Sequence, residues 1–252
     1  MGLIKFLNYK VDCFPSSLKW VVRWLHAMTF EMLIVFFGFF LRPFGYLRDQ
    51  KKSTGLASGR PILLVHGYLH DSSAWVYVRK HLASKGFGPI YTLNLIHPFR
   101  SIRSYAQLVA KKAEQIAEAT GRRDLILMGH SMGGLVSSWY ATKLAPAGTI
   151  TDVVTLGSPL NGTYVAWIAL GPNGKEMKPG SEFIQELQEA IAKNSDIQFY
   201  HIGTKTDQLI VPSSSAWFGD SVERQFAVED IGHVTLLFSK RILNKISQWI
   251  SV

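Results

Sequence analysis

From residue 61 onward, short runs of apolar residues alternate with longer stretches of helical periodicity. The apolar runs predict strands at 62–65, 90–95, 125–128, 153–156, 197–202 and 222–228. The periodic stretches predict helices at 72–84, 101–119, 132–145, 182–193 and 234–250. Strands that alternate with helices predict an α/β fold. Its central sheet would be mostly parallel, with helices on both faces and ligands at the carboxyl ends of the strands.

Residues 1–59 have a different pattern, and we expect a hydrophobic, basic segment and linker that precede a folded domain at 60–252. The polar, glycine-containing stretch 51–59 marks the linker. The chain has a formal net charge of +9, but residues 1–60 hold nine Lys or Arg and three Asp or Glu, a net +6. A basic excess concentrated beside an apolar stretch argues against nucleic-acid binding, which would spread the charge over the folded domain.

Residues 28–41 form an aromatic, apolar run of fourteen residues with one charge, Glu31. A perpendicular span of a bilayer needs about 20 apolar residues, so a plain transmembrane helix is not favoured. No small-residue cleavage site follows the run, which also argues against a cleavable signal peptide. Because basic residues flank the run, we expect residues 20–50 to associate with a membrane surface. The side of the membrane stays open. Packing on the folded domain or on a partner protein is the alternative.

The strongest chemical motif is Gly129-His130-Ser131-Met132-Gly133, which lies between the strand predicted at 125–128 and the helix predicted at 132–145. A serine on so sharp a turn exposes its hydroxyl above the sheet, and glycines beside it let the backbone pass closely. The N–H groups at the start of the helix point toward any oxygen that becomes negative nearby. We therefore predict that Ser131 attacks a carbonyl group and that the N–H of Met132 stabilises the resulting oxyanion.

A second oxyanion donor is predicted in His66-Gly67-Tyr68, at the end of the first strand. A glycine there lets the chain turn over the sheet edge and leaves the N–H of Tyr68 free to face Ser131. His66 is an alternative base. We interpret it instead as a buried histidine that braces the loop, because a better placed histidine follows later in the chain.

A serine nucleophile needs a base, and the base needs an acid that fixes its tautomer. His233 follows the last predicted strand, and Asp207 follows the strand at 197–202, so both belong to the carboxyl edge of the sheet. The chain order Ser131, Asp207, His233 is the one expected for these groups on an open α/β sheet.

Four other acidic residues compete with Asp207 for the role of orienting acid. Asp124 and Asp152 begin strands at the far edge, which favours a role in turns. Glu229 and Asp230 lie too near His233 in sequence to reach its ring easily, but they stay open as alternatives.

Five motifs occur in a fixed order: Leu63-Leu64-Val65-His66-Gly67, Gly129-His130-Ser131-Met132-Gly133-Gly134, Leu156-Gly157-Ser158-Pro159-x-x-Gly162, the Asp207 loop with Val211-Pro212, and Gly232-His233. This set resembles the α/β-hydrolase superfamily and is most similar to bacterial-type lipases and esterases. The resemblance implies an acyl-enzyme on Ser131, with His233 as base and then acid. It also implies that Asp207 orients His233 and that the N–H groups of Tyr68 and Met132 hold the oxyanion.

The chain departs from some secreted lipases of this kind in two respects. Cys13 is the only cysteine, so no intrachain disulfide can form. The sequence has no convincing carboxylate cluster for a structural calcium ion, Asp220 and Asp230 being solitary. We therefore expect no metal and no cofactor.

The stretch of about residues 160–195 is longer than a direct connection between strands requires, and we expect a cap-like insertion there. The stretch holds apolar residues between Tyr164 and Leu170, then a Gly-Pro-Asn-Gly turn at 171–174 and a helix. An apolar lid would favour acyl chains and shield the ester from water. The alternative is that Trp167 and its neighbours fill core beneath the loop.

Together these features predict a serine carboxylic ester hydrolase that acts on lipid or other acyl esters. Acyl transfer or thioester hydrolysis would use the same acyl-enzyme, and phospholipase activity is a further alternative. From a different class, a catalytically silent membrane-bound scaffold would keep the fold in order to bind lipid or a partner. The oligomeric state stays open.

Overall fold

The computed structural model describes residues 18, 21–29, 31–33, 54–55, 58–219 and 221–251. Most of the apolar run predicted at 28–41, and most of the linker, lie outside the described residues. Of the helices that are described, none combines the length and the apolar character needed to cross a membrane.

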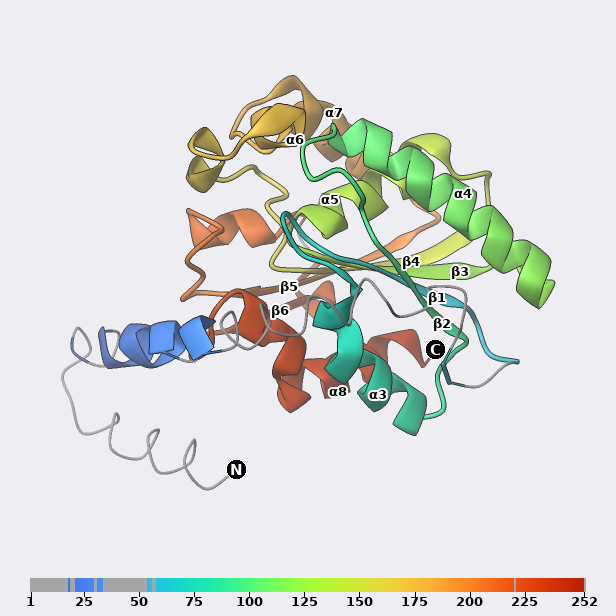
Figure 1. The fold of residues 1–252 in the computed structure, drawn as a ribbon, viewed down its shortest axis with the longest axis horizontal. Helices are drawn as coiled ribbons and strands as arrows, with labels where there is room; N and C mark the ends of the chain where they lie inside the picture. The colour runs from blue at the N-terminus through green and yellow to red at the C-terminus, as the bar shows by residue number, and fades with distance from the viewer. Residues whose placement is uncertain are drawn as a thin grey trace.

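Six parallel strands form one sheet in the order β2-β1-β3-β4-β5-β6 (Figure 1). They are β1 (Ile62–Val65), β2 (Ile90–Leu93), β3 (Leu125–His130), β4 (Ile150–Leu156), β5 (Gln198–Thr204) and β6 (Gln225–Val228). The strand order reverses at β1, because β2 and β3 pair with its opposite edges. Ligands of open α/β sheets bind at such a switch point, outside the carboxyl ends of the strands.

Helices cover both faces of the sheet, as predicted (Figure 1). One face carries α4 (Ile102–Thr120), α5 (Met132–Trp139), α6 (Gly171–Glu176) and α7 (Glu182–Ala192), and the other carries α3 (Val76–Ser84) and α8 (Lys240–Ile250). The shorter helical turns are η1 (Ser72–Trp75), η2 (Tyr140–Leu144), η3 (Tyr164–Trp167), η4 (Ser213–Ala216), η5 (Val222–Arg224) and η6 (Val234–Phe238). Alternate residues of β1 enter two separate cores, one beneath each helical layer. A strand buried on both faces reads as the continuous apolar run seen in the sequence.

Two local predictions were wrong. Residues 171–174, predicted as a turn, begin helix α6, with Pro172 in its first turn, where a missing N–H costs nothing. Asn173 is fully buried there and donates to the carbonyl of Pro98 at 2.7 Å, so tertiary contacts outweigh the local turn preference. Residues 222–224 form η5 rather than strand, because Val222 is 81% exposed and the sheet pairing begins only at Gln225.

The insertion predicted at about 160–195 divides into two parts with different surroundings. Helix α7 buries Phe183, Ile184, Leu187 and Ile191 in the core, and it belongs to the helical layer on the sheet. The stretch from Tyr164 to Leu170 instead exposes most of its large apolar side chains, which are those of Tyr164, Trp167, Ile168 and Leu170. Trp167 is 64% exposed, so the alternative that it fills core is wrong.

Candidate active site

Ser131 lies on the sharp turn between β3 and α5 that the motif predicts. Its backbone has φ 56° and ψ −128°, a conformation rarely adopted by residues with a side chain. The N–H of Ser131 donates to the carbonyl of Leu156 at 2.8 Å, which fixes the turn against the end of β4. The strained backbone is thus held by the sheet on which it sits.

Glycines make this turn sterically feasible. A Cβ on Gly129 would lie 2.3 Å from the carbonyl oxygen of Gly133, and one on Gly133 would lie 2.1 Å from that of Val65. A Cβ on Gly67 would lie 2.8 Å from Cβ of Ser131. The loop after β1 therefore packs directly on the serine, and Tyr68, the next residue, is adjacent to it.

His233 and Asp207 form a buried pair at the same edge of the sheet. Nδ1 of His233 lies 2.9 Å from Oδ2 of Asp207, and both side chains are almost wholly inaccessible to solvent. The other carboxylate oxygen of Asp207 accepts from the N–H groups of Leu209 and Ile210, at 2.9 and 2.8 Å. Because a carboxylate only accepts, Nδ1 carries the hydrogen and Nε2 has a free lone pair. Nε2 is buried and makes no hydrogen bond within the described part of the chain.

Ser131 and His233 both pack against the end of β4. The N–H of Ser131 bonds to Leu156, and a Cβ on the following residue, Gly157, would lie 3.1 Å from Nδ1 of His233. His130, which precedes the serine, packs its ring 4.7 Å from the ring of His233, centroid to centroid. Nε2 of His130 also lies 3.1 Å from the carbonyl oxygen of His233. The serine turn and a tautomerically fixed imidazole thus both lie at the carboxyl end of β4.

The electrostatics distinguish the two histidines. Burial lowers the pKa of His233, but the charge and hydrogen bond of Asp207, with the charge of Glu31, outweigh it and raise the pKa above its ordinary value. Burial, reinforced by the neighbouring charge of His233, holds the pKa of His130 well below its usual range. His233 is therefore the better proton acceptor of the two.

His66 has the bracing position interpreted from the sequence. Its Nε2 accepts from the N–H of Leu95 at 2.8 Å, which ties the loop after β1 to the loop after β2. The side chain is 2% exposed. It is therefore occupied in holding the loop that packs on Ser131.

The competing acids bind basic side chains, and within the described residues none of them is hydrogen-bonded to His233. The ion pairs are Asp124 with Arg122, Asp152 with Arg60, Asp230 with Arg241, and Glu229 with Arg23 and Lys205. Asp207 is the carboxylate that reaches the Nδ1 atom of the ring.

Two side chains that contact the His233 loop were missed by the sequence analysis. His130 was noted only as part of the serine motif, and Glu31 only as the single charge of an apolar run. His130 could have been noticed because it directly precedes the nucleophile candidate. Glu31 is brought to the loop by a contact that spans 203 positions, for which the local sequence has no signal.

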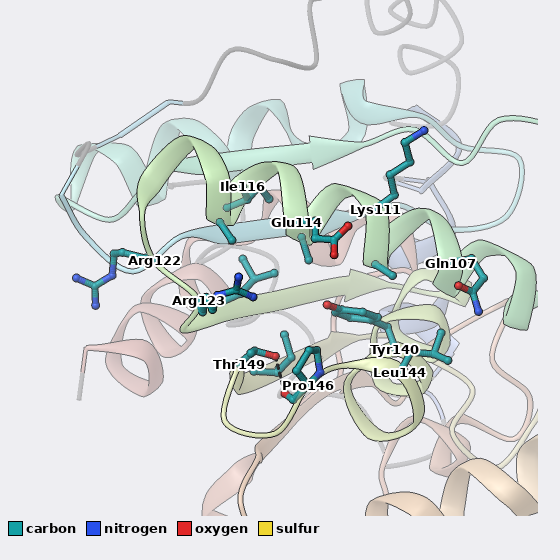
Figure 2. Close-up of a pocket in the computed structure, with 15 residues that line it drawn as sticks. Gln107, Lys111, Glu114, Ile116, Arg122, Arg123, Tyr140, Leu144, Pro146 and Thr149 are labelled. Carbon is teal, nitrogen blue, oxygen red and sulfur yellow. Dashed lines mark hydrogen bonds between the residues drawn. The ribbon is translucent and has the colours of Figure 1, made fainter.

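Two cavities lined by described residues lie at opposite edges of the sheet. One of about 180 Å³ lies at the carboxyl edge beside Gly67, Leu95 and Met132. A larger one of about 360 Å³ lies between α4 and the Tyr140–Leu144 turn, at the amino ends of β3 and β4 (Figure 2). The smaller cavity adjoins the serine turn. Within the described residues, no cluster of three or more histidine, cysteine or acidic side chains is placed to bind a metal ion.

Residues 62–240 match the alpha/beta hydrolase family. The chain belongs to this family. It is 30% identical over 122 residues to triacylglycerol lipases of Pseudarthrobacter phenanthrenivorans and Burkholderia plantarii. The match covers 45% of this chain and only 37% and 33% of those proteins. Among solved structures, the mature lipase BlEst2 of Bacillus licheniformis superposes with a TM-score of 0.65 at 15% identity, covering 78% of this chain and 93% of that one. At that identity the likeness supports the fold alone.

Proposed function

We propose that this alpha/beta hydrolase is a serine hydrolase that cleaves carboxylic esters with lipid or other apolar acyl groups. The observation that carries the proposal is the buried pair of His233 and Asp207, 2.9 Å apart, beside the strained turn at Ser131. Activation of a serine hydroxyl as a nucleophile requires an imidazole held in a fixed orientation beside the turn that carries the serine.

In the proposed reaction, Oγ of Ser131 attacks the ester carbonyl and its proton passes to Nε2 of His233. Asp207 keeps the imidazole oriented and stabilises its positive charge. The bond between carbonyl carbon and alkoxy oxygen then breaks, His233 returns the proton to the leaving alcohol, and the acyl group stays on Ser131. Water resolves this acyl-enzyme by the same steps. The N–H groups of Tyr68 and Met132 are the proposed donors to the oxyanion.

Apolar side chains around the carboxyl edge support an acyl substrate. The stretch after β4 spans this edge, because Tyr164 bonds to the carbonyl of Val211 and Leu170 bonds to the hydroxyl of Tyr68. The exposed apolar side chains of this region, which we name the apolar rim, are Leu69, Ile96, Phe99, Tyr164, Trp167, Ile168, Leu170, Leu209 and Val211. Large exposed apolar surface typically marks a site for apolar ligands or interfaces. The distant relatives named as triacylglycerol lipases are consistent with such substrates.

We also propose that residues 20–50 associate with a membrane surface. Leu18, Val21, Leu25 and Met32 share one helical face and are 41–63% exposed. Ala27 and Glu31, on the opposite face, are buried. An apolar face that points away from the domain, beside the basic residues of the segment, suits a surface of anionic lipid.

Hydrolysis of p-nitrophenyl esters across a series of acyl chain lengths tests the proposal. We expect turnover that increases from acetyl toward longer chains and that is lost in Ser131→Ala. A preference for acetyl would contradict the lipid substrate while leaving ester hydrolysis intact. If an added alcohol accepts the acyl group in preference to water, the result would favour acyl transfer. If a thioester is cleaved in preference to the matching oxygen ester, it would favour thioester hydrolysis. No turnover of any ester would favour the scaffold.

A further inference from the structure

Glu31 joins the N-terminal helical segment to the loop that carries His233. Residues 31–33 are helical, and the carboxylate of Glu31 is buried against the segment after β6 (blue beside red in Figure 1). It accepts hydrogen bonds from the N–H of Val234 at 2.6 Å and from the N–H and Oγ1 of Thr235, at 3.1 and 2.9 Å. Three charge-assisted hydrogen bonds to adjacent residues make this a specific contact.

The contact fixes the backbone next to the imidazole. His233 is the cap residue of η6, and its side chain makes no capping hydrogen bond because its Nδ1 is bound to Asp207. The first N–H groups of a helical turn need an acceptor, and here Glu31 supplies it from another part of the chain. The position of His233 therefore depends on the carboxylate of Glu31 as well as on Asp207.

Gly232 is shaped for the same contact. A Cβ on Gly232 would lie 2.5 Å from Oε2 of Glu31 and 3.0 Å from its Cβ. A side chain at this position would therefore have to displace the carboxylate of Glu31. The motif Gly232-His233, singled out from the sequence for its histidine, therefore also contacts the N-terminal segment through Gly232.

Among the described residues, the titratable groups that face His233 come from three elements. Asp207 lies after β5, His130 ends β3, and Glu31 belongs to the N-terminal segment. Burial disfavours the protonated ring, whereas the two carboxylates favour it. His130 stays neutral because burial and the charge of His233 lower its pKa.

We propose that Glu31 is a positioning residue for His233, so that ester hydrolysis requires the N-terminal helical segment to be docked on the domain. This inference rests on the proposed function, in which His233 is the base. It gives the N-terminal segment a part in the reaction besides membrane attachment.

Glu31→Gln in the full chain tests the inference, with Arg23→Gln as the matched control. Arg23 is also on the N-terminal segment, and it forms a partly exposed ion pair with Glu229, four residues before His233, at 3.1 Å. We expect Glu31→Gln to lower kcat on a short-chain ester by about 10- to 10²-fold with little change in KM, because the imidazole is displaced. The acid limb of the kcat/KM profile should move to lower pH, since neutral His233 is the active form and loss of a carboxylate lowers its pKa. Arg23→Gln should leave both unchanged.

Thr235→Val separates hydrogen bonding from charge. It removes one of the three bonds, so we expect a smaller loss of kcat, an unmoved acid limb, and faster amide hydrogen exchange over residues 231–238. This variant keeps the inference testable if Glu31→Gln does not fold. Activity of Glu31→Gln that falls only with its folded fraction, at an unmoved pH midpoint, would overturn the inference. Wild-type protein that does not react with a fluorophosphonate would instead overturn the proposed function.

Discussion

The two edges of the sheet each hold a buried aspartate, but the aspartates have different partners. At the amino edge, Asp152 binds Nη1 of Arg60 at 2.7 Å. At the carboxyl edge, Asp207 binds Nδ1 of His233 at 2.9 Å. An arginine stays protonated in proteins, whereas an imidazole gains and loses a proton near neutral pH. We therefore propose that proton transfer takes place at the carboxyl edge, whereas the larger of the two described cavities lies at the amino edge (Figure 2).

Replacing each of the two aspartates with asparagine should give the largest difference in activity between the two edges. Asp207→Asn should lower kcat/KM by about 10⁴-fold, because the amide stabilises the wrong tautomer of His233. Asp152→Asn should leave kcat/KM within a few-fold but lower the free energy of unfolding by about 1–2 kcal/mol, since Arg60 is partly exposed and solvent screens its charge. Ester hydrolysis and urea unfolding of both variants measure this. Similar losses of activity in the two variants would contradict the assignment of chemistry to one edge.

Two glycine variants sharpen the comparison at a smaller scale. In Gly67→Ala the new Cβ collides with Ser131, so the loop that carries Tyr68 must shift and kcat should fall by about 10²-fold. Gly121, at the C-terminal end of α4, has φ 69° and open space around it. Gly121→Ala should therefore cost about 1 kcal/mol of stability, with unchanged kcat. An unaffected kcat in Gly67→Ala would remove this loop from the site.

Replacing apolar-rim side chains with serine should raise KM for long-chain esters selectively. Trp167→Ser and Ile168→Ser each remove a side chain that is more than half exposed. Loss of its contact with an acyl chain should raise KM for long-chain esters by about fivefold, equivalent to about 1 kcal/mol. KM for acetyl esters should not change. Val222→Ser is the control, because Val222 is 81% exposed beside the amino end of β6. Equal effects on short and long esters would contradict a role in acyl binding.

The outward face of the N-terminal segment should govern how the protein partitions between membrane and soluble fractions, without changing hydrolysis of soluble esters. Leu25→Ser with Met32→Ser should move protein from the membrane to the soluble fraction by a few-fold, because two exposed apolar side chains are lost. Hydrolysis of acetyl esters should be unchanged, since Glu31 stays in place. Fractionation of cells that express each form measures the shift, and identical partitioning would contradict the membrane proposal.

Local sequence predicted the central sheet well because its strands are buried on both faces and their apolar runs are unmistakable. It also predicted the strained turn at Ser131, where closely spaced glycines accompany a serine between a strand and a helix. It failed at 171–174 and 222–224. At 171–174, Asn173 makes a buried tertiary hydrogen bond that favours a helix over the turn. At 222–224, the sheet pairing does not extend as far as Val222.

The candidate site was predictable only where each residue has its own local context. Asp207 and His233 each follow a strand, so their shared edge follows from parallel topology. The contact of Glu31 with Val234 and Thr235 joins segments about 200 positions apart, and nothing in the apolar run around Glu31 indicates a partner. The packing of His130 on His233 likewise requires the assembled sheet.

Covalent labelling with a fluorophosphonate, followed by mass spectrometry of the modified peptide, tests the central claim most directly. We expect wild-type protein to be labelled on Ser131, and Ser131→Ala to be unlabelled while it retains its fold. Labelling of Ser131→Ala to the same extent, or a wild-type protein that does not react, would contradict a Ser131 nucleophile activated by His233.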